Sequence, residues 1–476
     1  MTTAQQEHLQ TASMHSVNPA TGETFGHYDT LVLSQVNDKI ARAQTAFAGY
    51  RLTGFAERAA WLTRAAEVLE ERRQELAELA TREMGKTLAA ALAEVQKCAV
   101  ACRYYAQNAE EFLADESVVT EALRAYVTYQ PLGVVLAVMP WNFPYWQVFR
   151  FIAPAIMAGN ALLLKHASNV PGCALAIEEV MREAGFPPEV FQTLLVGSAG
   201  ALAILKDERV KAVSLTGSEG ADRSVAGTAG SALKPSVMEL GGSDPFIVMP
   251  SADLELSIKT AVTARTINNG QSCTAAKRFI VHADICDRFV DGFVAGLAAL
   301  KMGAPMLAST DLGPLATPAI RAEVHGLVQD AISRGAKVLL GGQLPDDVGN
   351  YSPATALSEL PPEMGIYGEE VFGPVALIFR VGNIDEAITL ANATRFGLAS
   401  SVWTTDGAEQ ERFVRGIEAG SVFINAMVAS DPRLPFGGVK ASGFGRELSR
   451  HGIHEFVNTK TVSIGAAPGA HRSKTE

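Results

Sequence analysis

Short strand-like runs alternate with helical runs from Gly133 onward, and this alternation is the feature that most constrains the fold. Residues 134–138, VVLAV, are apolar and mostly β-branched, which predicts a strand, and residues 146–157 have the spacing of a buried helix. Parallel strands need crossover connections, which are usually helices, so we expect an α/β fold with mostly parallel sheet. The same pattern predicts strands at 161–164, 191–196 and 212–215, and a helix at 173–183.

A second α/β region begins near Ser236, where Gly241 and Gly242 mark the change. Its predicted strands are 245–248 and 278–281, and its predicted helices are 254–267 and 287–300. The first third of the chain is helical instead, with helices predicted at 56–84, which Gly85 ends, and at 86–112. A chain of 476 residues exceeds the size of one core, about 250–300 residues, so we expect two or three domains.

Charge and cysteine content limit the partners and the compartment. A net charge of −11 argues against a nucleic-acid partner. Prolines and polar residues interrupt the apolar stretch 134–164, which favours buried elements over a membrane span. The five cysteines form no disulfide framework, and the N-terminus has no basic start followed by an apolar run. We therefore expect a cytoplasmic protein without a membrane partner.

Cys273 is the candidate nucleophile, because it lies on the small, polar, glycine-bearing loop 268–274, NNGQSCT. Backbone amides and a substrate can both approach a thiol on such a loop. A lone cysteine is more often a small buried apolar residue, and this alternative stays open from the loop alone. The other four cysteines, Cys98, Cys102, Cys173 and Cys286, lie in helical or strand-like runs and are interpreted as structural.

Two further residues are suited to the chemistry of a thiol. Glu239 ends a predicted strand before two glycines, where a carboxylate can act as general base for water, although a cap or an ion pair is the commoner role. Asn142 lies between Pro140 and Pro144, and a rigidly held amide can donate to an oxyanion, although a structural turn is the alternative.

Strand ends also predict a nucleotide site. Lys165 and Ser168 follow one predicted strand, and Gly217 and Ser218 follow another just before a helix, where α/β sheets bind ligands. A solvated lysine is the alternative for Lys165. No G-x-G-x-x-G fingerprint is present in a strand-to-helix turn, so a dinucleotide site here would differ from the common Rossmann type. The Gly- and Pro-rich segments 369–374 and 435–443 are interpreted as loops that could close over a ligand.

Taken in order, these segments resemble the aldehyde dehydrogenase superfamily. The motifs are PWNFP, a strand-ending Lys, TGS, ELGG, GQSC, EEVFGP and PFGGVK, and NPATGE near the start also matches. Residues 139–148, 239–248 and 436–447 are most similar to the bacterial succinate-semialdehyde dehydrogenase branch. The resemblance implies two doubly wound α/β domains and a small β oligomerisation arm. It implies a dinucleotide-binding domain at 1–116 and 131–238, a catalytic domain at 239–435, and the arm at 117–130 and 456–470.

The resemblance also implies residue roles. Cys273 would attack the aldehyde, Asn142 and the Cys273 backbone N–H would stabilise the oxyanion, and Glu239 would activate water to hydrolyse the thioester. NAD or NADP would be the cofactor, and no metal is implied. The implied cofactor-binding residues are Trp141, Lys165, Ser168, Gly217, Ser218, Leu240, Glu370 and Phe372. The implied substrate residues are Arg150, Ser430 and Arg433, with Arg150 on the distal carboxylate of succinate semialdehyde, although a surface ion pair is the alternative for Arg150.

Four positions depart from the family pattern. Ile267 stands where some members carry an arginine, which weakens the carboxylate pocket or moves its second cation to Arg265. Ala275 replaces a second cysteine, so a disulfide switch is not expected. Asp222 replaces a glycine near the phosphate-side helix. Ser168 replaces a glutamate common in members that prefer NAD, so NADP should be tolerated unless Asp222 opposes it.

Three alternatives remain beside oxidation of succinate semialdehyde to succinate. An acylating dehydrogenase would pass the thioester to coenzyme A, but such members lack the glutamate found at Glu239. An enzyme for short-chain or hydroxylated aldehydes would not need the carboxylate pocket. A catalytically silent binding protein would have lost the Asn–Glu–Cys set, which is intact here. We expect a homodimer or homotetramer whose partner is a small-molecule aldehyde.

Overall fold

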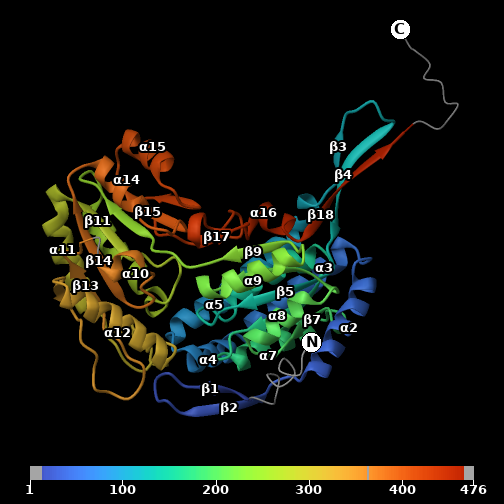
Figure 1. The fold of residues 1–476 in the computed structure, drawn as a ribbon, viewed down its shortest axis with the longest axis horizontal. Helices are drawn as coiled ribbons and strands as arrows, with labels where there is room; N and C mark the ends of the chain where they lie inside the picture. The colour runs from blue at the N-terminus through green and yellow to red at the C-terminus, as the bar shows by residue number, and fades with distance from the viewer. Residues whose placement is uncertain (1–12, 362–363, 466–476) are drawn as a thin grey trace, which may run out of the picture.

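The computed structural model describes residues 13–361 and 364–465, with the side chains of residues 221 and 222 left outside this description. Two large sheets form the body of the molecule, and a small antiparallel sheet projects from it (Figure 1). The α/β class predicted from the alternating runs is confirmed. The first residues of the predicted nucleotide region, residues 466–470 of the predicted arm and the Asp222 side chain lie outside the described residues.

The first large sheet has six strands, in the order β17-β9-β8-β5-β6-β7. The strands are β5 (Val134–Met139), β6 (Ala161–His166), β7 (Phe191–Thr193), β8 (Val210–Thr216), β9 (Ser236–Glu239) and β17 (Gly443–Phe444). All neighbours are parallel except β17, which pairs antiparallel with β9. The parallel ladder places the carboxyl ends of β5, β8 and β9 at one edge, and the motifs that follow those strands lie together there.

Alternate residues of β5 pack against helices on opposite faces of this sheet. Val134 and Leu136 lie in one buried cluster, and Val135 and Ala137 lie in another. The first face is covered by α2 (Leu33–Tyr50), α8 (Ser198–Lys206) and α9 (Glu219–Ser231). The second is covered by α3 (Phe55–Glu71), α4 (Arg73–Met84), α5 (Leu88–Phe112), α6 (Trp146–Met157) and α7 (Pro171–Glu183). Strands buried on both faces explain the continuous apolar runs of the sequence.

The helix predicted at 56–84 is divided in the structure, and this prediction was wrong at Arg72. The chain leaves helical geometry at Arg72 (φ −95°, ψ 11°) between α3 and α4. The guanidinium of Arg72 forms ion pairs with Glu179 and Glu183 of α7, so the turn is tied to the neighbouring helix. Apolar spacing does not show such a break, because Leu69 and Leu76 on either side are both fully buried.

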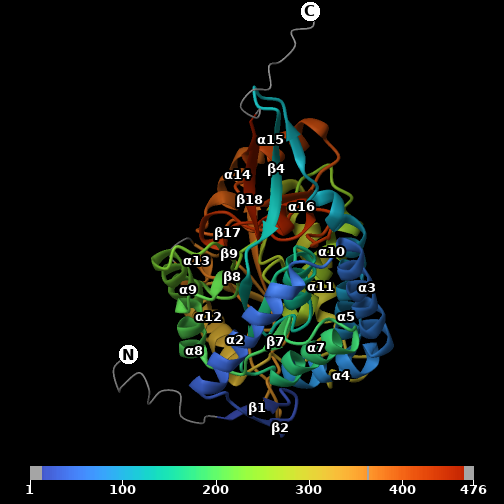
Figure 2. The same ribbon diagram turned by 90° about the vertical axis from the view of Figure 1, so that its right-hand side faces the viewer.

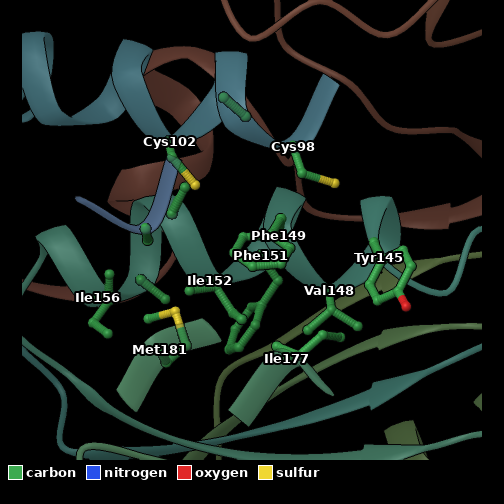
Figure 3. Packing of buried hydrophobic residues seen from close by; sticks show 14 of the residues in the cluster. Cys98, Cys102, Tyr145, Val148, Phe149, Phe151, Ile152, Ile156, Ile177 and Met181 are labelled. Atoms are coloured by element: carbon green, nitrogen blue, oxygen red, sulfur yellow. The ribbon is translucent and has the colours of Figure 1, made fainter. Parts of the chain in front are cut away.

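Helix α5 packs on α6 in the interior of this region, as Figure 3 shows. Cys98 and Cys102 of α5 lie in the same buried cluster as Phe149 and Ile152 of α6 and are completely buried. All five cysteines of the chain are free thiols, and only Cys273 is more than slightly exposed.

The second large sheet has seven strands, in the order β12-β13-β14-β11-β10-β15-β16. The strands are β10 (Pro245–Val248), β11 (Arg278–His282), β12 (Lys337–Leu340), β13 (Thr355–Ser358), β14 (Val375–Val381), β15 (Ala399–Trp403) and β16 (Ser421–Ile424). Only β12 is antiparallel to its neighbour. The flanking helices are α10 (Leu254–Thr266), α11 (Ala283–Ala298), α12 (Pro318–Ser333), α13 (Gly365–Gly368), α14 (Ile384–Asn392) and α15 (Gly407–Gly416).

The projecting sheet joins segments that are far apart in the sequence. β4 (Arg124–Pro131) pairs antiparallel with β18 (Val457–Ile464) on one side and with β3 (Glu116–Val118) on the other. Both views show these strands extending beyond the helices of the body (Figure 2). A short helix, α16 (Ser449–His454), precedes β18, and a hairpin of β1 (Ser13–Val17) and β2 (Thr24–Asp29) lies at the opposite end. No helix among the described residues is long and apolar enough to cross a membrane.

Candidate active site

Two cavities meet at Cys273 and Gln147, which line both of them. The larger, of about 390 Å³, lies at the carboxyl ends of β5, β8 and β9. The smaller, of about 220 Å³, lies between α5, α6 and the loop 427–430. A half-buried thiol between a large and a small cavity can react with a small molecule on one side while a larger one lies on the other.

The nucleophile loop, residues 267–273, owes its shape to residues that tolerate left-handed backbone. Asn268 (φ 55°), Asn269 (φ 58°) and Gly270 (φ 77°) occupy that region in succession. Asparagine and glycine adopt this conformation at the lowest cost. A Cβ on Gly270 would lie 2.3 Å from the Gly373 carbonyl carbon, so glycine is also required by close packing.

The two asparagine side chains fix this loop to its surroundings. Asn268 Nδ2 donates to the backbone oxygens of Asn142, at 2.7 Å, and Gln271, at 2.9 Å. Asn269 Nδ2 donates to the Gly85 oxygen at 2.9 Å, and its Oδ1 accepts from the Gly313 N–H at 2.9 Å. The loop is therefore bonded both to the region of the six-stranded sheet, at Gly85 and Asn142, and to the region of the seven-stranded sheet, at Gly313. The bond to the Asn142 backbone holds the PWNFP segment close to the loop that carries Cys273.

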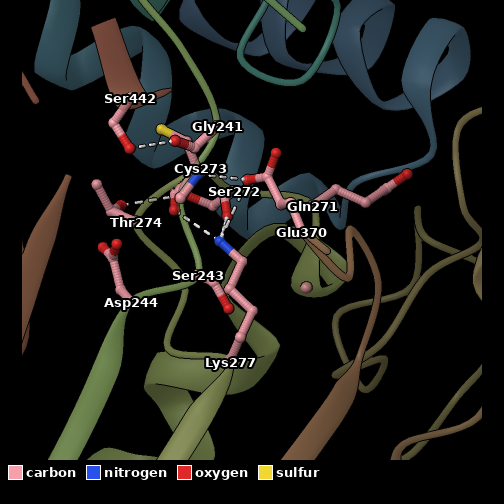
Figure 4. A network of polar contacts seen from close by, with 12 residues as sticks. Gly241, Ser243, Asp244, Gln271, Ser272, Cys273, Thr274, Lys277, Glu370 and Ser442 are labelled. Atoms are coloured by element: carbon pink, nitrogen blue, oxygen red, sulfur yellow. Dashed lines mark hydrogen bonds and ion pairs between the residues drawn. The ribbon is translucent and has the colours of Figure 1, made fainter. Parts of the chain in front are cut away.

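A buried lysine, Lys277, holds the loop from below (Figure 4). Its ammonium donates to the backbone oxygens of Ser272, at 2.8 Å, and Cys273, at 2.6 Å, and lies 3.4 Å from Glu370 Oε1. Glu370 in turn accepts from the Gly242 N–H at 3.0 Å. Lys277 was not predicted from the sequence, because most lysines are exposed and nothing in its neighbourhood along the chain marks this one as buried.

The environment of Cys273 sets its protonation. Burial raises the pKa of the thiol to about 12, although the positive charges of Arg150 and Lys277 act in the opposite direction. The thiol is thus largely protonated at neutral pH in this state, and a bound partner or a base has to help form the thiolate.

Glu239 ends β9 as predicted, but its carboxylate lines neither cavity in this structure. It is 1% exposed, and neither oxygen has a hydrogen-bond partner among the described residues. A Cβ on Gly437 would lie 2.6 Å from Glu239 Oε1, so the carboxylate points toward that glycine. Burial raises the pKa of Glu239, the charge of Arg150 opposes this, and the charge of Glu447 adds to it.

Asn142 lines the larger cavity beside Cys273. Its amide Nδ2 donates to the Gln271 oxygen at 3.2 Å, and its Oδ1 is buried without a partner among the described residues. One amide hydrogen of Asn142 is therefore used by the loop, and the second is available to a ligand.

Six of the eight predicted cofactor-binding residues line the larger cavity: Trp141, Gly217, Ser218, Leu240, Glu370 and Phe372. Trp141 and Phe372 meet edge to face, with ring centroids 5.7 Å apart. A Cβ on Gly241 would lie 2.1 Å from Glu370 Oε2, so the glycine allows that carboxylate to approach. The other two, Lys165 and Ser168, follow β6 and are not part of the lining. Lys165 is buried, which lowers its pKa, and Ser168 is exposed.

The predicted substrate residues separate into two groups. Arg150, Ser430 and Ile267 line the smaller cavity. Arg433 does not line it: its side chain is exposed and donates to Asp431 Oδ2 at 2.6 Å. Arg265 is also absent from the lining, because its buried guanidinium donates to the Gly270 oxygen at 2.7 Å. Ala275 is buried behind the loop.

Lys97 and Gln147 are cavity residues that were not predicted from the sequence. Lys97 lies on α5 and lines the smaller cavity. Gln147 lies at the junction, with its Oε1 buried and unpaired among the described residues. Gln147 falls within residues 139–148, a segment quoted for the family resemblance, so its position close to PWNFP was a signal for it. Lys97 had no such signal, because nothing in the sequence of α5 indicates which face of the helix meets a cavity. Within the described part of the chain, no group of His, Cys or acidic residues is arranged to hold a metal.

Comparisons with known proteins agree with this arrangement. A sequence profile of the aldehyde dehydrogenase family matches residues 5–462. The probable NADP-dependent succinate-semialdehyde dehydrogenase of Synechocystis sp. is 56% identical over 449 residues, or 94% of this chain and 99% of that protein. The NADP-dependent succinate-semialdehyde dehydrogenase 1 of Mycobacterium tuberculosis is 58% identical over 452 residues, again 94% and 99%.

Solved structures show the same likeness. The succinic semialdehyde dehydrogenase of Streptococcus pyogenes in complex with NADP+ has a TM-score of 0.93 and 37% identity, covering 95% of this chain and 100% of that one. The fold and these likenesses define an oxidoreductase built from two α/β regions. The chain belongs to the aldehyde dehydrogenase family, whose members oxidise aldehydes to carboxylic acids. The family and fold predicted from the ordered motifs are confirmed.

Proposed function

We propose that this chain oxidises succinate semialdehyde to succinate, with NADP as the hydride acceptor. The position of Cys273 at the meeting point of two cavities carries the proposal. The bacterial relatives named above support the substrate and the cofactor. The smaller cavity supports a carboxylate-bearing aldehyde, because Lys97 and Arg150 line it. Glu94 also lines it, but its charge is matched by the buried ammonium of Lys86.

The larger cavity fits a dinucleotide. Gly217 and Ser218 precede the 13-residue helix α9, whose N-terminus favours a pyrophosphate. Trp141 and Phe372 offer apolar faces for a nicotinamide, and Glu370 in the same lining is proposed to hold one ribose. Lys165, at the end of β6 and outside that lining, is proposed to hold the other. Bound NADP supplies the acceptor for the hydride that leaves the substrate carbon. Ser168, where a glutamate would repel a 2′-phosphate, supports NADP over NAD.

The chemistry of the chain's own residues follows from their positions. The Cys273 thiolate adds to the aldehyde carbon, which forms a C–S bond and places negative charge on the oxygen. The second hydrogen of the Asn142 amide and the Cys273 N–H donate to that oxygen. Loss of the hydride converts the adduct to a thioester, water then adds to its carbonyl, and the C–S bond breaks to release the acid and the thiol.

Glu239 is proposed as the base that takes the proton from this water. Burial raises the pKa of Glu239 above its usual value, so the ionised carboxylate is a stronger base than that of an exposed glutamate. Its carboxylate has no hydrogen bond to give up among the described residues when it turns from Gly437 toward Cys273. The presence of Glu239 supports hydrolysis over transfer to coenzyme A.

The remaining assignments are also proposals. The six-stranded region would bind the dinucleotide, the seven-stranded region would carry the nucleophile, and the projecting sheet would join protomers into a dimer or tetramer. Five free cysteines support a reducing, cytoplasmic location.

Replacement of the thiol tests the proposed function. Wild-type protein should produce NADPH from NADP and succinate semialdehyde, and Cys273→Ala should abolish it, because Cys273 is the only described cysteine that lines either cavity. Cys286→Ala, a buried position on α11 that lines neither cavity, is the matched control and should retain the wild-type rate. Equal rates in wild type and Cys273→Ala would contradict the mechanism, and no activity in the wild type would contradict the function.

A further inference from the structure

The smaller cavity has two cations, and one of them is already neutralised. Arg150 forms a buried ion pair with Glu447, and its Nη2 donates to Thr216 Oγ1 at 3.1 Å. Its guanidinium also lies over the Phe436 ring, 4.7 Å from the centroid. Because Glu447 is fully buried with it, the charge of Arg150 is matched within the protein before any substrate arrives.

Lys97 has no such partner. Its ammonium lies 4.2 Å from the centroid of the Trp146 ring and donates to Ser430 Oγ at 2.7 Å. No carboxylate among the described residues forms an ion pair with it. The nearest acids are committed elsewhere, because Glu94 pairs with Lys86 and Asp431 pairs with Arg433.

We propose that Lys97 is the specificity-determining cation that binds the distal carboxylate of the substrate. The Ser430 hydroxyl, which accepts from Lys97, would donate a second hydrogen bond to the same carboxylate. The proposal deepens the proposed function and rests on it. Lys97, Ser430 and Cys273 line one cavity of about 220 Å³, which suits a short aldehyde held at both ends. The carboxylate binds the ammonium and the hydroxyl while the carbonyl carbon meets the thiol.

The electrostatic surroundings of Lys97 support this assignment. Its pKa is lowered to about 8, first by burial and then by the positive charge of Arg150. A bound carboxylate would oppose both effects, so the anion and the charged lysine stabilise each other. Trp146 holds the ammonium over its ring and leaves the remaining donors of Lys97 free to reach a ligand.

The lowered pKa has a consequence for the pH dependence of selectivity. Lys97 is charged below about pH 8 and neutral above it, so preference for a carboxylate-bearing aldehyde should fall as pH rises through that value. The other charged or titratable groups that face it are Arg150, Cys98, Glu94 and Asp431. Burial holds the pKa of Cys98 well above its usual value, and Arg433 lowers the pKa of Asp431 to about 2. Glu94 is ion-paired with Lys86, and Arg150 with Glu447.

The test compares succinate semialdehyde with butanal, which has the same number of carbons but no carboxylate. The measured quantity is the ratio of the two kcat/KM values, in which the titration of Cys273 cancels. Lys97→Met should lower this ratio by about tenfold to a hundredfold, the usual value of a hydrogen bond to a charged group. Lys97→Arg should keep the preference and move its decline to higher pH, because arginine stays charged.

Arg103→Met is the matched control, since Arg103 lies on the same helix but pairs with Glu70 away from the cavity. The ratio and its pH profile should match those of the wild type. A ratio within about twofold of wild type in Lys97→Met, or a ratio in the wild type that is flat across pH 8, would overturn the assignment of Lys97. A wild type without preference for succinate semialdehyde would contradict the proposed function itself.

Discussion

Single residues decide whether the thiol is presented or buried. Four of the five cysteines are packed into helices, whereas Cys273 follows three residues in left-handed or glycine-permissive backbone. Cys273, Asn142 and Glu239 were predicted from ordered motifs, and the first two line the same cavity. Lys97 was not predicted, because a lysine on an amphipathic helix has the same appearance whether it faces water or a cavity.

Replacement of Gly270 should displace the nucleophile. Gly270→Ala puts a Cβ into the Gly373 backbone and strains a positive φ, so we expect a loss of about 1–3 kcal/mol in unfolding free energy and a large fall in kcat. Denaturant unfolding and steady-state kinetics measure the two effects. Gly230→Ala in α9 has open space around its Cβ, so it should leave kcat unchanged and raise the unfolding free energy by up to about 1 kcal/mol, opposite in sign to Gly270→Ala. Wild-type behaviour of Gly270→Ala would contradict the packing argument.

Ser168 should influence the choice of cofactor. Ser168→Glu places a carboxylate at the end of β6, where it would repel a 2′-phosphate and accept hydrogen bonds from ribose hydroxyls. We expect the ratio of kcat/KM for NADP over NAD to fall at least about tenfold. Ser168→Gln, of equal size but uncharged, separates charge from bulk. If both variants shift the ratio equally, repulsion of the phosphate is not the cause.

At the scale of elements, the sequence predicted regular segments well and their junctions poorly. The bounds of α6 and β10 agree with the residues predicted from periodicity, because each has a clear apolar pattern and a proline or glycine nearby. The break at Arg72 has neither residue and depends on ion pairs to α7, which lies a hundred residues later in the chain. The two-residue strand β17 is too short to leave a pattern, and only its partner β9 makes it a strand.

The ion pairs at the α3–α4 junction should stabilise the fold. Arg72 is 18% exposed and pairs with Glu75, Glu179 and Glu183, so Arg72→Ala should lower the unfolding free energy by about 1 kcal/mol. Arg64→Ala is the control, because Arg64 is 43% exposed and pairs only within α3, and its loss should be clearly smaller than that of Arg72→Ala. Chemical denaturation measures both. Equal losses would show that Arg72 does not tie the junction to α7.

In the whole molecule, the three-stranded sheet projects from the body, and among the described residues its strands pair with neither of the two large sheets of the chain. β3, β4 and β18 extend from the body, and the turn between β3 and β4 exposes Val119 fully and Leu123 by 71% (Figure 1). Apolar side chains on a projecting sheet are typical of a surface covered by another protomer.

Charged replacements on this turn test self-association. Val119→Asp combined with Leu123→Asp should lower the mass measured by light scattering, because burial of two carboxylates opposes assembly. Leu233→Asp, at a position 93% exposed after α9, is the control and should keep the wild-type mass. An unchanged mass in the double variant would show that this turn lies outside the interface.

The pairing of β9 with β17 has a consequence for how the chain is assembled. The chain leaves the six-stranded sheet at Glu239 and re-enters it at Gly443, directly opposite, so residues 240–442 are in topological terms one very long hairpin loop. Because the two ends of residues 240–442 are adjacent, this segment can be inserted into or exchanged within the chain while the strand order of the six-stranded sheet stays the same. Glu239 therefore belongs to the six-stranded region and Cys273 to the inserted segment 240–442. A small rigid-body shift between these two regions would change the distance between base and thiol while the internal structure of each region stays the same.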